Sequence, residues 1–92
     1  MTTLGAISGG TAKRLTVASA SRALVALLGA DGSAMGIFTV STTSGGTVTR
    51  LGLGELSHIT DSTETNTLIL QNTGSATIGV YAIVFNGSVT QQ

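Results

Sequence analysis

This chain of 92 residues and 9.1 kDa is long enough for one small domain and too short for two. Only 9% of its residues are charged, against about 25% in an average domain, and four basic side chains balance four acidic ones. The absence of cysteine excludes disulfides, thiol nucleophiles and thiolate metal sites. Four carboxylates and one histidine leave little material for acid–base catalysis, and 3% aromatic residues with so few basic ones argue against nucleic-acid binding.

The polarity of the chain comes from hydroxyl groups and backbone, because serine, threonine and glycine together make up 39 residues and the mean hydropathy is +0.44. The longest apolar or small runs, Ala23–Ala30 and Ile78–Phe85, are eight residues each, whereas a membrane-spanning helix needs about 20. Residues 1–10 have no basic residue and no apolar segment of signal-peptide type, so we expect no secretory signal and production in a cytoplasm. A neutral surface of this kind predicts burial by association.

Residues 1–12 contain three glycines and no charge, with isolated apolar residues at Leu4 and Ile7. This pattern predicts a flexible N-terminal arm over residues 1–12, followed by a β domain over residues 13–92. The β domain begins with a strand from Lys13, because Leu15 and Val17 alternate with smaller or polar residues.

The middle of the chain predicts further short strands. Arg22–Gly29 is short for a helix, although serines precede it and a glycine ends it, and the hairpin signal Ala30-Asp31-Gly32 favours a strand. Met35–Ser41 and Thr47–Leu53 predict two more strands, joined by a turn of Ser, Thr and Gly. Gly54–Asn66 is the most polar and least regular stretch, with a short strand expected at Ser57–Thr60.

The C-terminal third carries the clearest pattern. Thr67–Gln71 and Ala76–Phe85 predict two strands around the turn at 72–75, and Ser88–Gln92 is either a last edge strand or a tail. Both sides of the strand at Ala76–Phe85 are apolar, which indicates burial on both faces or a position at a subunit interface.

Seven or eight short strands with frequent turn signals predict an all-β fold, a small single-domain β-sandwich or partly open barrel. Proline is absent and charges are few, so the edge strands lack their usual protection against pairing with other chains. We therefore expect these edges to be covered by other subunits.

His58, Asp61 and Glu64 are the one cluster of metal-ligand types, but their segment shows no apolar stripe to dock a helix and no paired histidines. A serine triad built on His58 and Asp61 lacks the Gly-x-Ser-x-Gly signature. Gly52-Leu53-Gly54 lacks the third glycine and the helix of a dinucleotide loop. We expect no catalytic residue, no metal, no cofactor and no small-molecule substrate.

The stretch Ser21–Ile37, SRALVALLGADGSAMGI, resembles the head decoration proteins of lambda-type tailed phages. In that family a strand of the form Ser-Arg-x-Leu-Val-Ala leads through a loop to Asp-Gly-x-Ala-x-Gly-Ile. The same residues also fit a generic strand–turn–strand hairpin. The matching positions here are Ser21, Arg22, Leu24, Val25, Ala26, Asp31, Gly32, Ala34, Gly36 and Ile37.

The resemblance implies a β-tulip-like homotrimer on the exterior of a phage capsid, made in the bacterial cytoplasm and bound to the major capsid protein. The N-terminal arm would contact the capsid shell, with no role for nucleic acid or membrane. Three arms in one trimer would gain affinity by avidity. The capsid-contacting residues expected on this basis are Thr2, Thr3, Leu4, Ile7, Lys13 and Arg14, and the expected subunit-interface residues are Tyr81, Ile83 and Phe85.

An alternative is a tail-fibre, spike or baseplate module involved in host attachment, since TLILQNTGSATIGVYAIVF also resembles small β modules of phage tail and base structures. That reading predicts a carbohydrate or other surface ligand. Only three aromatic side chains are available to stack on a sugar, namely Phe38, Tyr81 and Phe85. A small hydrolase or metal enzyme that uses His58 and Asp61 is the third class, and we expect no activity.

Overall fold

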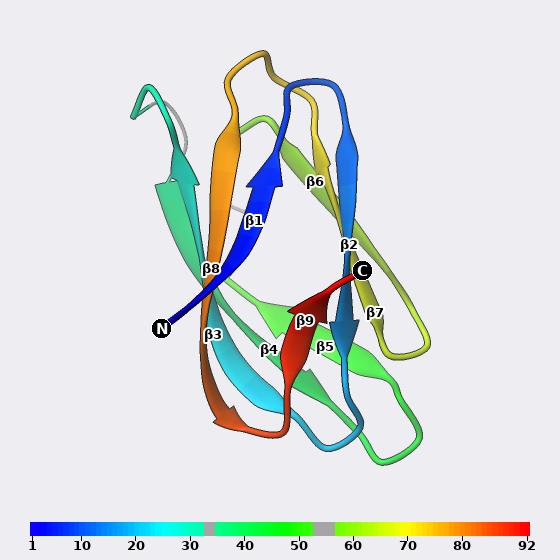
Figure 1. Ribbon diagram of the computed structural model, residues 1–92. Coiled ribbons are helices and arrows are strands. Elements are labelled where there is room, and N and C mark those ends of the chain that lie inside the picture. The colour runs from blue at the N-terminus through cyan, green and yellow to red at the C-terminus, as the bar shows by residue number, and fades with distance from the viewer. Residues whose placement is uncertain (33–34, 53–56) are drawn as a thin grey trace.

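The computed structural model is a sandwich of two antiparallel sheets (Figure 1). Alternating apolar side chains of the strands pack between these sheets. The structure describes residues 1–32, 35–52 and 57–92. The strands are β1 (Thr2–Ile7), β2 (Ala12–Val17), β3 (Arg22–Gly29), β4 (Met35–Thr42), β5 (Val48–Leu51), β6 (Ile59–Glu64), β7 (Thr67–Asn72), β8 (Ile78–Asn86) and β9 (Val89–Gln91). The all-β sandwich predicted from the sequence is confirmed.

One sheet has five strands in the order β1-β8-β3-β4-β5, and the other has four in the order β6-β7-β2-β9. Neither closes on itself, so the fold is an open sandwich and not a barrel. β8 and β3 are the longest-paired neighbours and run antiparallel from Ala23 opposite Val84 to Gly29 opposite Ile78. The polar edge strand β6 is longer than the short strand expected at Ser57–Thr60.

The core lies between the sheets and takes every second residue of each central strand. Val25 and Leu27 of β3 face Leu15 of β2 and Leu68 and Leu70 of β7 across this layer, all five with no exposed surface. Phe38, 1% exposed, is the largest side chain in it. Burial of a side chain of this size stabilises the fold by about 1.5–3 kcal/mol relative to leaving it exposed.

Buried polar groups lie at both ends of the sandwich. The amide of Asn72, fully buried, donates to the carbonyls of Ile7 (3.0 Å) and Ala76 (2.7 Å) and accepts from the backbone N–H of Gly74 (3.0 Å). At the opposite end the backbone N–H of Ser21 donates to the Thr42 hydroxyl at 2.8 Å. No buried side-chain polar atom of the described residues is left without a partner.

The N-terminal segment differs from the predicted flexible arm. Residues 2–7 form β1, which pairs with β8, and Leu4 and Ile7 are 2% and 1% exposed. The reason is a bulge at Gly5, which has a φ of +88° and lies where the pairing register shifts between Thr3 and Ala6. A bulge adds one residue to one strand, so two apolar residues three positions apart both enter the core and a strict two-residue period is hidden.

Within the part of the chain that the structure describes, no helix is long and apolar enough to cross a membrane.

Candidate functional site

The outer side of the five-stranded sheet carries rows of apolar side chains. One row runs across β8, β3, β4 and β5 as Ile83, Leu24, Thr39 and Leu51, which the strand registers place side by side. The next row runs across β1, β8, β3 and β4 as Thr3, Tyr81, Ala26 and Ile37. We call the surface of Leu24, Ala26, Leu28, Ile37, Leu51, Tyr81 and Ile83 the outer apolar face.

Exposure on this face is high for large apolar residues. Ile37 is 58% exposed, Leu51 68%, Ile83 44% and Leu28 42%. Phe85, at the bulge near the end of β8, is 70% exposed. Scattered exposed apolar residues are ordinary, but a contiguous patch is typical of an interaction surface.

Tyr81 lies flat on this face, over its neighbour Gly79. A Cβ added to Gly79 would lie 2.9 Å from the Tyr81 hydroxyl oxygen and 3.0 Å from Cε2 of its ring. The glycine therefore makes room for the ring, which covers backbone that would otherwise be open to water, a pairing of glycine and aromatic residue known to favour strands.

Charge is almost absent from the outer apolar face. Arg22, exposed at the start of β3, is the one charged side chain on the described outer side of this sheet. The outer side of the four-stranded sheet differs, because Arg14 of β2 and Glu64 of β6 form an ion pair there, with side chains 45% and 58% exposed. A second ion pair, Arg50 with Asp61, joins edge strand β5 to edge strand β6 and is more buried, at 29% and 23%.

The residues predicted to contact a capsid do not form one arm. Thr2 and Thr3 are exposed on β1, whereas Leu4 and Ile7 belong to the core. The two basic residues lie on β2 in the other sheet, Lys13 half-buried and Arg14 paired with Glu64. Contact of any of these residues with a capsid stays a prediction.

The residues predicted for a subunit interface all lie on β8. Tyr81 is half-buried and Ile83 exposed on the outer apolar face, and Phe85 lies beside its end. Ile37 and Leu51 of neighbouring strands belong to the same surface and were missed, because their strands were identified without knowing which side would face out. The strand register supplies that information.

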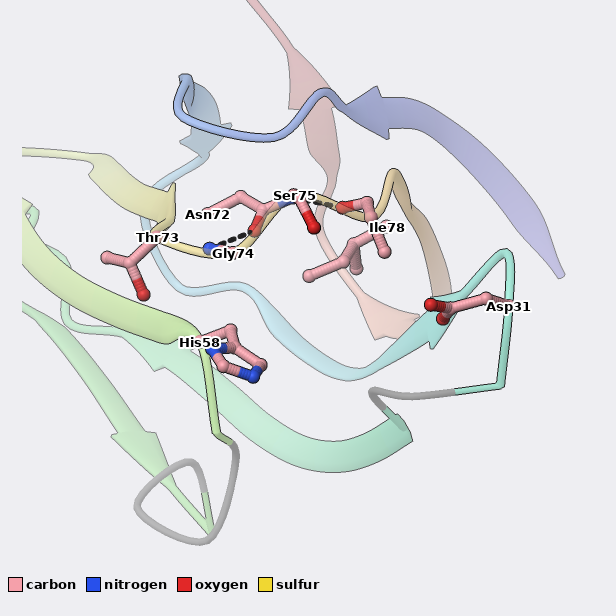
Figure 2. A pocket seen from close by; sticks show the side chains of 8 residues that line it. Asp31, His58, Asn72, Thr73, Gly74, Ser75 and Ile78 are labelled. Atoms are coloured by element: carbon pink, nitrogen blue, oxygen red, sulfur yellow. Dashed lines mark hydrogen bonds between the residues drawn. The ribbon is translucent and has the colours of Figure 1, made fainter.

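A cavity of about 500 Å³ opens at one end of the sandwich (Figure 2). His58 and Asp31 approach it from different sides, from the residue before β6 and from the turn after β3 (Figure 2). Thr73 and Ser75 add hydroxyl groups, and the amide of Asn72 is occupied by its backbone partners. The lining can offer hydrogen bonds to a small polar molecule, but none of its described residues is a Phe, Tyr or Trp on which a sugar would stack.

The structure separates the His58, Asp61 and Glu64 cluster. His58 lines the end cavity, Asp61 pairs with Arg50 between the sheets, and Glu64 pairs with Arg14 on an outer side. Among the described residues no group of three or more His, Cys, Asp or Glu side chains could hold a metal ion. Leu53 and Gly54 of Gly52-Leu53-Gly54 lie outside the described residues.

Comparison with known proteins gives a likeness of fold. No family model and no curated protein matches the chain. A solved structure that is similar is the tailspike protein gp49 of Acinetobacter baumannii bacteriophage Fri1, a capsular polysaccharide depolymerase, with a TM-score of 0.68 and 18% sequence identity. The likeness covers 99% of this chain and 18% of the tailspike, so the chain corresponds to a small part of that protein.

Proposed function

We propose that this chain is a structural module of a tailed-phage virion that acts through contact with other proteins and catalyses no reaction. The observation that carries the proposal is the outer apolar face, since a surface of this kind in a domain with little charge is suited to packing against protein. Two likenesses support the phage setting: the fold shared with part of a tailspike, and the local resemblance of Ser21–Ile37 to head decoration proteins.

The favoured position is in the tail, as a spike or fibre module. The tailspike likeness extends over 99% of the chain, whereas the decoration resemblance of Ser21–Ile37 takes in β3 and only the first three residues of β4. The depolymerase activity of the tailspike is not carried over, because this chain corresponds to 18% of that protein and its Asp61 and Glu64 are engaged in ion pairs.

The second position is on the capsid exterior, as a trimeric decoration protein bound to the major capsid protein. It is favoured by the Ser21–Ile37 resemblance, which falls on a hairpin in the middle of the five-stranded sheet. One argument for the decoration position is weakened, because the segment expected to reach over the capsid forms β1 and places Leu4 and Ile7 in the core. A capsid contact would then use Thr2, Thr3 and the outer apolar face rather than a free arm.

Immunoelectron microscopy tests both positions. Antibodies raised against the purified chain are applied to phage particles from the bacterial strain that carries its gene, with antibodies to the major capsid protein as the control for head labelling. Label at the tail tip or tail fibres is the expected result. Label over the head would replace the tail position with the decoration position, and particles without label would overturn the proposal.

A further inference from the structure

We infer that the outer apolar face is covered by the same face of another copy of this chain, so that the working form is a homo-oligomer. This inference deepens the proposed function by naming the partner, and it rests on that proposal only for its place in a virion. The surface is built by residues from β8, β3, β4 and β5, four adjacent strands of one sheet.

The area of the face is suited to a stable contact. Leu28, Ile37, Leu51 and Ile83 are each 42% to 68% exposed. With Phe85 at 70% beside them, side chains of this size present on the order of 500 Å² of exposed surface. A standard interface buries about 800 Å² per partner, and the threonines between and around the apolar residues would supply much of the remainder as a polar rim.

The charge of the face favours the chain itself as the partner. The described outer side of this sheet has no acidic side chain, and its one basic residue, Arg22, lies beside the outer apolar face at the start of β3, where a contact can leave it in solvent. Packing the face on its own copy therefore buries no opposed like charges near its centre. The formal net charge of the whole chain is zero, so long-range repulsion between copies is weak.

The shape of the outer apolar face is also suited to packing against a second sheet. Short side chains alternate with long ones, Ala26 between Tyr81 and Ile37 and Thr39 between Leu24 and Leu51. Two such faces can interdigitate at the spacing of about 10 Å found in β-sandwiches. Two copies can meet across a two-fold axis, and three can turn the same face toward a three-fold axis.

The test compares one residue type on the two outer sides. Thr39→Glu places a carboxylate in the outer apolar face, and Thr60→Glu places one on the outer side of the four-stranded sheet, where Thr60 is exposed on β6. Ile37→Glu is the stronger variant, at a side chain 58% exposed. The mass of each full-length protein is measured by sedimentation or light scattering over micromolar concentrations, with circular dichroism as the check of folding.

The expected result is a wild-type assembly of two or three copies of the 9.1 kDa chain. Thr39→Glu and Ile37→Glu should raise its dissociation constant by roughly tenfold or more while the fold is kept, because each buries a charge in the contact. Thr60→Glu should change it by less than about threefold. A wild-type monomer at about 100 μM, or an assembly weakened by Thr60→Glu and indifferent to the other two, would overturn the inference.

The failure of this inference is distinguishable from failure of the proposed function. A monomer that still labels phage particles means that another virion protein covers the face, which refutes self-association and leaves the virion role in place. An oligomer that is absent from phage particles refutes the virion role and leaves self-association in place.

Discussion

The two sheets of this protein share one core but present different surfaces to their surroundings. On its outer side the four-stranded sheet carries hydroxyl groups and the Arg14–Glu64 ion pair, as expected of a face in contact with water. The described part of the five-stranded sheet carries isoleucine and leucine there, 42% to 68% exposed, and one charged side chain, Arg22, at the start of its central strand β3. The low charge of the chain is therefore not spread evenly, and the sheet that lacks charge is the one suited to contact with protein.

The largest difference in stability is expected between substitutions on the inner and outer sides of the five-stranded sheet. Phe38 and Ile37 are neighbours on β4, 1% and 58% exposed. Phe38→Ala should lower the free energy of unfolding by about 3–5 kcal/mol because it leaves a cavity in the core. Ile37→Ala should change it by less than about 1 kcal/mol in the monomer. Urea unfolding followed by circular dichroism measures both, and equal losses would contradict the assignment of the two sides.

The next effect concerns β1, which the sequence pattern presents as an arm and the structure places in the five-stranded sheet. Leu4→Ala should lower the free energy of unfolding by about 2–3 kcal/mol, because Leu4 is 2% exposed. Thr3→Ala, at the exposed neighbouring position, is the control and should cost less than about 0.5 kcal/mol. Thermal unfolding decides between the two descriptions, since a free arm would make both variants neutral.

A smaller effect is expected from Gly79→Ala, which changes the outer apolar face without adding charge. The new methyl group would meet the Tyr81 ring at about 3 Å, so the ring must turn away from the sheet. We expect a loss of about 1 kcal/mol in stability. Tyr81 is the single tyrosine and the chain has no tryptophan, so its fluorescence and its quenching by iodide report the movement directly. Unchanged quenching would show that the ring does not lie over Gly79.

The smallest effects come from the two ion pairs. Asp61→Asn removes the partly buried pair with Arg50 that links β6 to β5, and should cost about 1 kcal/mol. Glu64→Gln removes the exposed pair with Arg14 and should cost about 0.3 kcal/mol. Chemical unfolding in low and high salt separates them, because salt should weaken the exposed pair more. A larger loss for Glu64→Gln would mean that the outer pair, and not the pair between the sheets, holds β6.

The local pattern of the sequence predicted most of the strands, because period-two alternation and turn residues act over a few positions. Arg22–Gly29 and Thr67–Gln71 show this, since both match observed strands to within one residue. β1 was missed because the bulge at Gly5 breaks the alternation between Leu4 and Ile7. β6 was underestimated because it is an edge strand that buries few apolar side chains.

Predicting the residues of the candidate sites required the tertiary structure more than predicting the strands did. The sequence alone showed that both sides of β8 are apolar, and Tyr81, Ile83 and Phe85 were predicted as interface residues for that reason. Ile37 and Leu51 joined that surface only through the pairing of β8 with β3, β3 with β4 and β4 with β5. His58 and Asp31 line one cavity although 27 positions separate them, since the ends of different strands converge there.

By itself, the sequence determined that this protein is a small all-β domain with very little charge, because composition and alternation are properties of the chain and its nearest neighbours. Only the tertiary structure decided which side of each strand faces the core, where Arg50 meets Asp61, and that the first strand is part of the sandwich. Those outcomes depend on contacts between distant segments, and burial in one shared core selects among them.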